Sequence, residues 1–277
     1  MVKFTWVGGP TFLLEVGDLR ILTDPVFGEG DLAFIMTDDP ATGEALAPVK
    51  RHVPFKKVNI EEVDLVLLSH LHSDHFDLAA ESQLPQTIPM IVSSYDAPKL
   101  KARGYEKVQV LDWWQACPLY KNGAEVTLTA VPARHAHSDH LNRDLGVVNG
   151  YWLSCTNRST PYTHNIYWTG DTVWFEGMRN ISHKLGKPDV LVPHMGAEGE
   201  AGPLGRLTLN ASDTVKMMQW FNPHFLIPIH HHTFSHYVES VEVLFDLLSD
   251  LKQRERVVIL EEGKSMILSE EGKIQMD

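Results

Sequence analysis

The most informative segment of the 277-residue chain reads Ser69-His70-Leu71-His72-Ser73-Asp74-His75-Phe76-Asp77. Three histidines and one aspartate fall within six positions of this segment. It follows the apolar run Leu65-Val66-Leu67-Leu68, which is typical of a buried strand. A strand that ends in His-x-His-x-Asp-His is accounted for if the loop surrounds metal, because neutral imidazole and carboxylate bind zinc and related divalent ions. The alternative, a polar surface loop that happens to be rich in histidine, is disfavoured by the tight spacing and the strand before it.

The order of the four side chains suggests two ions. Alternate residues of an extended segment point the same way, so His70 and His72 can share one ion. Asp74 and His75 lie past a bend and can reach a second.

Two further positions have the chemistry of a ligand and an alternative explanation. His135 follows the alternating run 126–131, and on chemistry alone His137 and His140 compete with it almost equally. Asp171 follows the strand-like run 166–169 and Gly170, so its carboxylate could approach a metal closely. Asp171 could also cap a helix that begins at Thr172.

Three consecutive histidines, His230-His231-His232, follow the strand-like run Leu226-Ile227-Pro228-Ile229. A histidine tract can be a plain surface feature. The buried strand before it favours a functional role. A shift of the strand by one residue would exchange which of the three faces the site.

These motifs, taken together and in this order, resemble the metallo-β-lactamase superfamily. The branch that they resemble includes L-ascorbate-6-phosphate lactonase and N-acyl phosphatidylethanolamine phospholipase D. The resemblance runs from about residue 3 to about residue 238. Besides the segment quoted above, it rests on the following matches: Trp6-Val7-Gly8-Gly9-Pro10-Thr11, Leu22-Thr23-Asp24-Pro25-Val26-Phe27, Leu111-Asp112-Trp113-Trp114, Pro132-Ala133-Arg134-His135, Thr169-Gly170-Asp171-Thr172 and Pro228-Ile229-His230.

The resemblance implies a four-layer αββα sandwich, an α/β fold with metal ions at the edge of the sheets, formed by a single domain over residues 1–277. It implies two divalent metal ions, zinc first, with manganese or iron also compatible with the ligands. One ion would be bound by His70, His72 and His135, the other by Asp74, His75 and His230, with Asp171 shared. His231 and His232 depart from the family pattern, in which an aromatic residue and glycine usually follow the histidine.

The implied chemistry is hydrolysis, in which a metal-bound hydroxide attacks a small ester-like substrate, either a lactone or a phosphodiester. We expect Asp74, Asp171 and His236 to be catalytic. His236 would donate a proton to the leaving group and would not bind metal. Its alternative is a surface histidine.

Arg206 and His194 are weaker predictions, for substrate binding. Asp24 is expected either to orient a ligand histidine or to form a simple Asp-Pro turn. Residues 196–205, with four glycines, are expected to form a loop near the pocket.

Composition limits the partners. The net charge of −12, from 24 basic and 36 acidic residues, opposes binding to nucleic acids and to anionic membrane surfaces. No apolar run approaches the ~20 residues of a membrane span. Two cysteines are too few for a disulfide framework, and the N-terminus has no signal-peptide pattern. We therefore expect a soluble cytoplasmic enzyme with a small-molecule substrate, no nucleic acid partner and no membrane insertion, and leave homo-oligomer formation open.

Three other functions compete with this one. A redox enzyme of the same superfamily, di-iron or thiol-oxidising, is disfavoured in its flavin-partnered form, since that group has a carboxylate where His72 stands. A nucleic-acid-processing hydrolase is disfavoured by the acidic charge. A metal-binding protein without catalysis is disfavoured by the complete ligand set.

The local pattern predicts strands at 2–7, 11–16 and 19–23, with a hairpin turn at Gly17-Asp18. Later strands are expected at 65–69, 89–93, 107–111, 124–131, 151–154, 166–169, 190–192, 225–229 and 257–260. Helical spacing is found at 211–218, with Asn210 or Ser212 as cap, and at 241–251. The long segment 27–58 is expected to form a lid or a binding loop.

Overall fold

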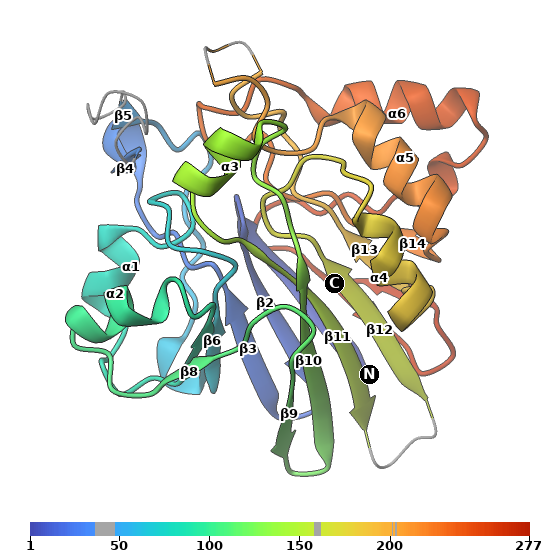
Figure 1. The fold of residues 1–277 in the computed structure, drawn as a ribbon. Coiled ribbons are helices and arrows are strands. Elements are labelled where there is room, and N and C mark those ends of the chain that lie inside the picture. The colour runs from blue at the N-terminus through green and yellow to red at the C-terminus, as the bar shows by residue number, and fades with distance from the viewer. Residues whose placement is uncertain (37–47, 158–161, 201, 203) are drawn as a thin grey trace.

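Two β-sheets lie face to face at the centre of the computed structural model, which describes residues 1–36, 48–157, 162–200, 202 and 204–277 (Figure 1). Helices α1 and α2 cover the outer face of one sheet, and α4, α5 and α6 cover the outer face of the other. This arrangement confirms the expected αββα sandwich. The helices are α1 Leu78–Gln83, α2 Ala97–Ala102, α3 Asp139–Asp144, α4 Met178–Leu185, α5 Ala211–Phe221 and α6 Val241–Asp250.

The first sheet has eight strands in the order β16-β15-β1-β2-β3-β6-β7-β8. Its β3, β6, β7 and β8 run parallel, and the remaining pairs are antiparallel. The strands are β1 Val2–Gly8, β2 Thr11–Val16, β3 Leu19–Thr23, β6 Leu65–Leu67, β7 Met90–Val92, β8 Val108–Val110, β15 Ser265–Leu268 and β16 Ile274–Met276.

The second sheet has six strands in the order β14-β13-β12-β11-β10-β9. Its β12, β13 and β14 run parallel, and the other pairs are antiparallel. The strands are β9 Ala116–Lys121, β10 Ala124–Pro132, β11 Asn149–Asn157, β12 Thr163–Trp168, β13 Val190–Val192 and β14 Phe225–Leu226. A separate pair, β4 Phe34–Ile35 with β5 Pro48–Val49, forms part of the long segment between β3 and β6.

The main core lies between the two sheets. Alternate residues of β1 and β2, such as Phe4 and Phe12, face alternate residues of β10 and β11, such as Leu128 and Leu153, and all are fully buried. Two smaller apolar clusters join each sheet to its helices. Central parallel strands such as β6 and β13 are buried on both faces, so their polar groups gather at the strand ends.

The strand ends place the predicted site. In both sheets the parallel strands end on the same side, and β3, β6, β12, β13 and β14 are each followed within a few residues by a histidine or an aspartate. β10 likewise leads through Pro132 to His135. The ligands predicted from the sequence therefore come from two sheets and meet at one end of the sandwich.

Most predicted elements are present with bounds shifted by one to three residues. The hairpin between β2 and β3 turns at Gly17-Asp18, and Asn210 caps α5 by accepting from the Asp213 amide at 2.9 Å. The expected strand at 257–260 is wrong, since this segment makes only an isolated bridge at Val257. Strand β9 and the final pair β15–β16 were not predicted. Of the expected loop 27–58, residues 37–47 lie outside the described part of the chain.

Candidate metal centre

Three histidines form the first half of the site. The Nδ1 atom of His72 lies 3.1 Å from Nε2 of His70 and 3.1 Å from Nε2 of His135. His70 and His135 are buried, and His72 is half-buried. These are the residues that the sequence predicted for one ion, and the structure brings them together.

The hydrogen bonds on the far side of these rings fix which nitrogens carry protons. His72 donates through Nε2 to the Leu145 carbonyl (3.0 Å), and His135 donates through Nδ1 to the Leu207 carbonyl (3.0 Å). A carbonyl can only accept, so the inward nitrogens of neutral rings carry lone pairs. Burial, reinforced by His135, lowers the pKa of His72 to about 4, which keeps that ring neutral at pH 7. Lone pairs 3.1 Å apart repel each other unless a cation lies between them.

The second half of the site adds two carboxylates to two imidazoles. Oδ2 of Asp74 lies 3.6 Å from Nε2 of His75 and 3.7 Å from Nε2 of His230. His230 donates through Nδ1 to the Met195 carbonyl (3.2 Å), so its Nε2 lone pair also points inward. His230 has a left-handed backbone (φ 60°), which is uncommon for a residue with a side chain.

Asp171 lies between the two halves. Its Oδ2 is 3.1 Å from Nε2 of His75 and 3.7 Å from Nε2 of His135, and its Oδ1 is 3.6 Å from Nε2 of His230. Gly170 before it has φ 58°, and a Cβ there would come within 2.6 Å of the Asn149 carbonyl oxygen. Asp171 is not followed by a helix, because α4 begins only at Met178, so the alternative role as a helix cap is wrong.

Asp24 supports the second half from behind. Its Oδ2 accepts from Nδ1 of His75 at 2.6 Å and from the Ser69 hydroxyl at 2.5 Å, and its Oδ1 accepts from the Ser69 amide at 2.7 Å. Because Ser69 gives its only hydroxyl proton to Asp24, its oxygen accepts from Nδ1 of His70 (2.9 Å). Asp24 thus orients ligands on both sides, as one of the two sequence interpretations proposed.

The charge balance of the site calls for cations. Asp24, Asp74, Asp171 and Glu198 are all buried, and no lysine or arginine among the described residues forms an ion pair with any of them. Burial alone would lower the pKa of His75, but Asp171, Asp74 and Asp24 together raise it well above its ordinary value. Buried carboxylates are costly unless paired or bound to metal. The donor set and the missing counter-charges therefore fit divalent ions.

His194 lies behind Asp171 and not in a substrate pocket. It is fully buried, and its Nδ1 lies 2.8 Å from Oδ1 of Asp171. Trp168 can only donate, and its indole N–H bonds to Nε2 of His194 at 2.6 Å. His194 therefore keeps its proton on Nδ1 and donates it to Asp171. With both nitrogens engaged, His194 cannot bind substrate as the sequence suggested, and it is not a metal ligand.

Of the two remaining candidates, Arg206 is paired with acidic side chains, whereas His236 lies beside the predicted ligand Asp74. The Arg206 guanidinium lies 2.7 Å from Oδ2 of Asp213 and 3.3 Å from Oε1 of Glu200, so acidic side chains already engage it. Nε2 of His236 lies 3.6 Å from Oδ2 of Asp74, at the edge of the second half of the site. Substrate binding by Arg206 and proton donation by His236 stay predictions.

The competing histidines lie elsewhere. His140 is exposed and pairs with Asp144 at 2.8 Å, and His137 lies beside Arg206. His231 packs against Trp6, and His232 pairs with Glu262 at 3.1 Å on the side away from the ligands. His135 and His230 are thus the members of their groups that face the centre.

His231 also gives the protein a pH-dependent stability. Burial, reinforced by His232, lowers the pKa of His231 to about 3, whereas an unfolded histidine titrates near ~6.5. The unfolded chain therefore binds more protons between these values, and the free energy of unfolding falls as the pH drops from about 6.5 towards about 3. We expect His231→Gln to make this fall shallower. Urea unfolding of the metal-free unaltered protein and variant at pH 7 and pH 5 measures this difference. An equal fall in the free energy of unfolding in both proteins would contradict the prediction.

Glu198 is the residue that sequence reasoning missed. It lies in the glycine-containing segment after β13, and its carboxylate is 4.0 Å from Nε2 of His236. Burial, together with Asp74 and Asp171, raises the pKa of Glu198 well above its ordinary value. The available signal was its place after a parallel strand beside β12, because such strand ends share one edge.

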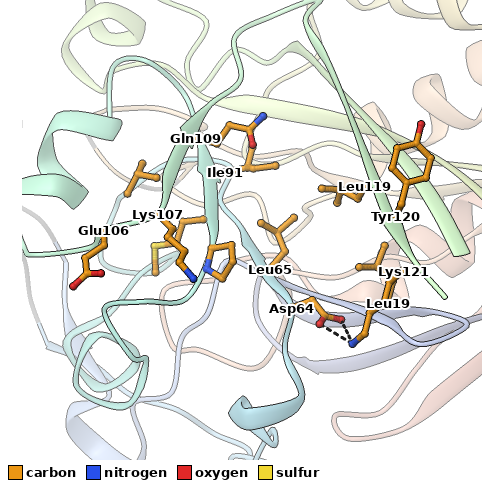
Figure 2. Close-up of a pocket in the computed structure, with 13 residues that line it drawn as sticks. Leu19, Asp64, Leu65, Ile91, Glu106, Lys107, Gln109, Leu119, Tyr120 and Lys121 are labelled. Carbon is orange, nitrogen blue, oxygen red and sulfur yellow. Dashed lines mark hydrogen bonds and ion pairs between the residues drawn. The ribbon is translucent and has the colours of Figure 1, made fainter.

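A pocket of about 510 Å³ lies at the other end of the sheets (Figure 2). Leu65, Met90 and Val108, the starts or near-starts of the parallel strands, line it, and Lys121 pairs with Asp64 there at 2.7 Å. None of the predicted ligands contributes to it.

In the described part of the chain, no helix has the length and apolarity needed to cross a bilayer.

Comparisons with known proteins agree with this architecture. A metal-dependent hydrolase of Pyrococcus furiosus is 26% identical over 97% of this chain and 100% of its own length. The N-acyl-phosphatidylethanolamine-hydrolyzing phospholipase D 1 of Caenorhabditis elegans is 26% identical over 92% of this chain and 73% of its own. The crystal structure of an isothiocyanate hydrolase from Delia radicum gut bacteria superposes with a TM-score of 0.78, at 22% identity over 97% of this chain and 99% of the other.

A relationship to L-ascorbate-6-phosphate lactonase in particular stays a prediction. The family described as beta-lactamase superfamily domain matches residues 19–231, a stretch that includes every predicted metal ligand. Because that match covers most of the chain and the fold is the one the family adopts, this protein belongs to the metallo-β-lactamase superfamily.

Proposed function

We propose that the protein is a dinuclear metal-dependent hydrolase of a small ester-like substrate, a lactone or a phosphodiester. The observation that carries the proposal is the convergence of inward lone pairs in two groups that share Asp171. Outward hydrogen bonds to acceptors fix these lone pairs in advance, and buried carboxylates supply the balancing charge.

The residues of the site would have the following roles. When bound, two divalent ions supply Lewis acidity toward a carbonyl or phosphoryl oxygen and lower the pKa of a water that they bind. His70, His72 and His135 would hold one ion, and Asp74, His75 and His230 the other. Asp171 would touch both, with His194 holding its carboxylate in place. Zinc fits the three-histidine half.

The substrate class rests on charge and on relatives. A net charge of −12 opposes a polyanionic partner, which favours a small molecule over nucleic acid. The relative from Caenorhabditis elegans is named for hydrolysing a phospholipid, and the one from Pyrococcus furiosus is named a metal-dependent hydrolase. These names support hydrolysis, with a phosphodiester as one of the two proposed substrates. We expect no nucleic acid partner and no membrane insertion.

Metal removal and substrate screening test the proposal. Protein purified without chelator should contain close to two divalent ions per chain, and should hydrolyse members of a panel of lactones, small phosphodiesters and thioesters. Chelation should abolish this activity, and added metal should restore it, while His224→Ala, a surface change remote from the site, should behave as the unaltered protein.

Three results would contradict the proposal. A maximum of one ion per chain under metal-replete conditions would exclude the dinuclear site. Cleavage of tRNA or single-stranded RNA far faster than any small ester would make it a nucleic-acid-processing enzyme. Oxygen consumption or thiol oxidation without hydrolysis would make it a redox member of the superfamily.

A further inference from the structure

Two side chains outside the ligand set described above, one buried and one largely buried, face its second half. Glu198 is 5% exposed, and the side chain of His236 is 11% exposed. Oε2 of Glu198 and both ring nitrogens of His236 are buried without a hydrogen-bond partner. Buried polar atoms are nearly always paired, so an unpaired carboxylate and imidazole that face each other point to a bound group.

The free atoms converge on one place. Nε2 of His236 lies 3.6 Å from Oδ2 of Asp74 and 4.0 Å from Oε2 of Glu198. With Nε2 of His230, these four atoms all lie within 4.8 Å of one another. That spacing suits atoms around a single ion.

The surrounding structure holds the backbone of Glu198 and the ring of His236 there. The Glu198 amide donates to the Thr208 hydroxyl at 2.9 Å, and its carbonyl accepts from the Leu207 amide at 2.8 Å. The His236 ring packs against the rings of Phe234 and Tyr237, with centroids 6.0 and 4.2 Å away. Both residues are thus anchored by contacts within the chain.

A shared histidine decides between one ion and two. Nε2 of His230 lies 3.6 Å from Asp171 and 3.7 Å from Asp74, so it belongs to the second ion, and it also belongs to the group with Glu198 and His236. An imidazole nitrogen has one lone pair and binds one ion. We propose that Glu198 and His236 are further ligands of the second ion, a conclusion that rests on the two-metal site of the proposed function.

Six donors, three oxygens and three nitrogens, would then fill the shell of the second ion, which leaves the open positions for water and substrate at the first ion. The six donors come from Asp74, His75, Asp171, Glu198, His230 and His236. Structural and catalytic zinc is mostly four-coordinate, whereas octahedral sites rich in carboxylate suit metals such as manganese and iron. The second position therefore selects Mn²⁺ or Fe²⁺ over Zn²⁺, and the three-histidine position does not.

Metal titration of two independent variants tests this inference. Metal-free samples of the full chain, of Glu198→Gln and of His236→Ala are titrated with Mn²⁺ and with Zn²⁺ by calorimetry, with elemental analysis of the products. Each variant should lose Mn²⁺ affinity at one of two positions by at least about tenfold, the lower range for groups that merely support metal ligands. Zn²⁺ binding should change less. Glu200→Gln and His224→Ala, which alter exposed side chains of the same types, serve as matched controls and should bind as the unaltered protein does.

Cobalt provides a second readout. Six-coordinate Co²⁺ absorbs visible light weakly, and loss of a ligand should strengthen the absorption of either variant at the second position. Circular dichroism confirms folding, and if one variant does not fold, the other decides. Unchanged Mn²⁺ affinity with an unchanged Co²⁺ spectrum would overturn the proposal. Three ions per chain in the unaltered protein would do so too, by giving Glu198 and His236 an ion of their own.

The outcomes also separate this inference from the function. Two tightly bound ions with the expected variant effects, but no hydrolysis of any ester, would leave the coordination standing and refute the proposed reaction. His236→Ala that keeps both ions at full affinity and loses kcat would instead support proton donation by His236, and would overturn its assignment as a ligand.

Discussion

Asp171→Ala should release both metal ions, and with them nearly all hydrolytic activity. Its carboxylate lies close to inward-facing ligand nitrogens of both halves of the site, His135 on one side and His75 and His230 on the other. Removing it also leaves the proton of His194 without an acceptor. Elemental analysis after dialysis should fall from near two ions per chain to well below one. We expect kcat/KM to fall by more than about 10³-fold, since loss of one group that stabilises transition-state charge typically costs about 10²–10³.

His135→Ala is the comparison that gives this result its meaning. His135 belongs to the first half alone, so its loss should empty mainly one position and leave the second ion bound. If Asp171→Ala also lost a single ion, Asp171 would belong to one half only. Thermal melts with excess metal show whether either variant has simply lost its fold.

Asp24→Asn should weaken the second ion strongly although residue 24 touches no metal. The amide has nearly the same shape as the carboxylate and can still accept from the Ser69 amide, but it lacks the charge that holds the proton on Nδ1 of His75. Loss of such supporting partners typically costs about 10–100-fold in metal affinity. Competition with a chromophoric chelator measures the change.

A matched carboxylate provides the control. Asp24 follows β3, whereas Asp64 precedes the neighbouring parallel strand β6 at the opposite end and pairs with Lys121. Asp64→Asn should leave metal affinity unchanged. Equal losses of metal affinity in both variants would mean that Asp24 matters to the fold of the sheet and not to the orientation of His75.

The fold could be predicted well where a local pattern, such as alternation, helical spacing or a turn residue, determines the element. The hairpin of β2 and β3 follows from alternation around Gly17-Asp18, and α5 follows from helical spacing after Asn210. The last strands could not be predicted this way. β15 pairs with β1 in a register that joins Ser265 to Thr5, 260 positions earlier, and nothing local in Ser265–Leu268 identifies that partner. The layered arrangement itself came from family resemblance and not from periodicity.

The site shows the same division. Tight spacing revealed His70, His72, Asp74 and His75, because one short segment carries them all. Among the three consecutive histidines, only the fold could show that the left-handed turn at His230 aims its ring inward.

The roles of His194 and Glu198 could not be predicted from the sequence for a related reason. Both follow β13, and their roles depend on neighbours brought by other strands. Trp168 on β12 occupies one nitrogen of His194 and turns it toward Asp171. Glu198 faces Asp74 and His236, which are remote in sequence.

The origin of the ligands in two sheets has a consequence for the synthesis of the protein. His70 and His230 are separated by 160 positions. At about 5–20 residues per second, a ribosome takes roughly 8–32 s to synthesise that interval. Through all of it, the nascent chain displays the histidine-rich loop without the partner that completes the second position. The full ligand set of the second position is therefore complete only after most of the chain has been synthesised.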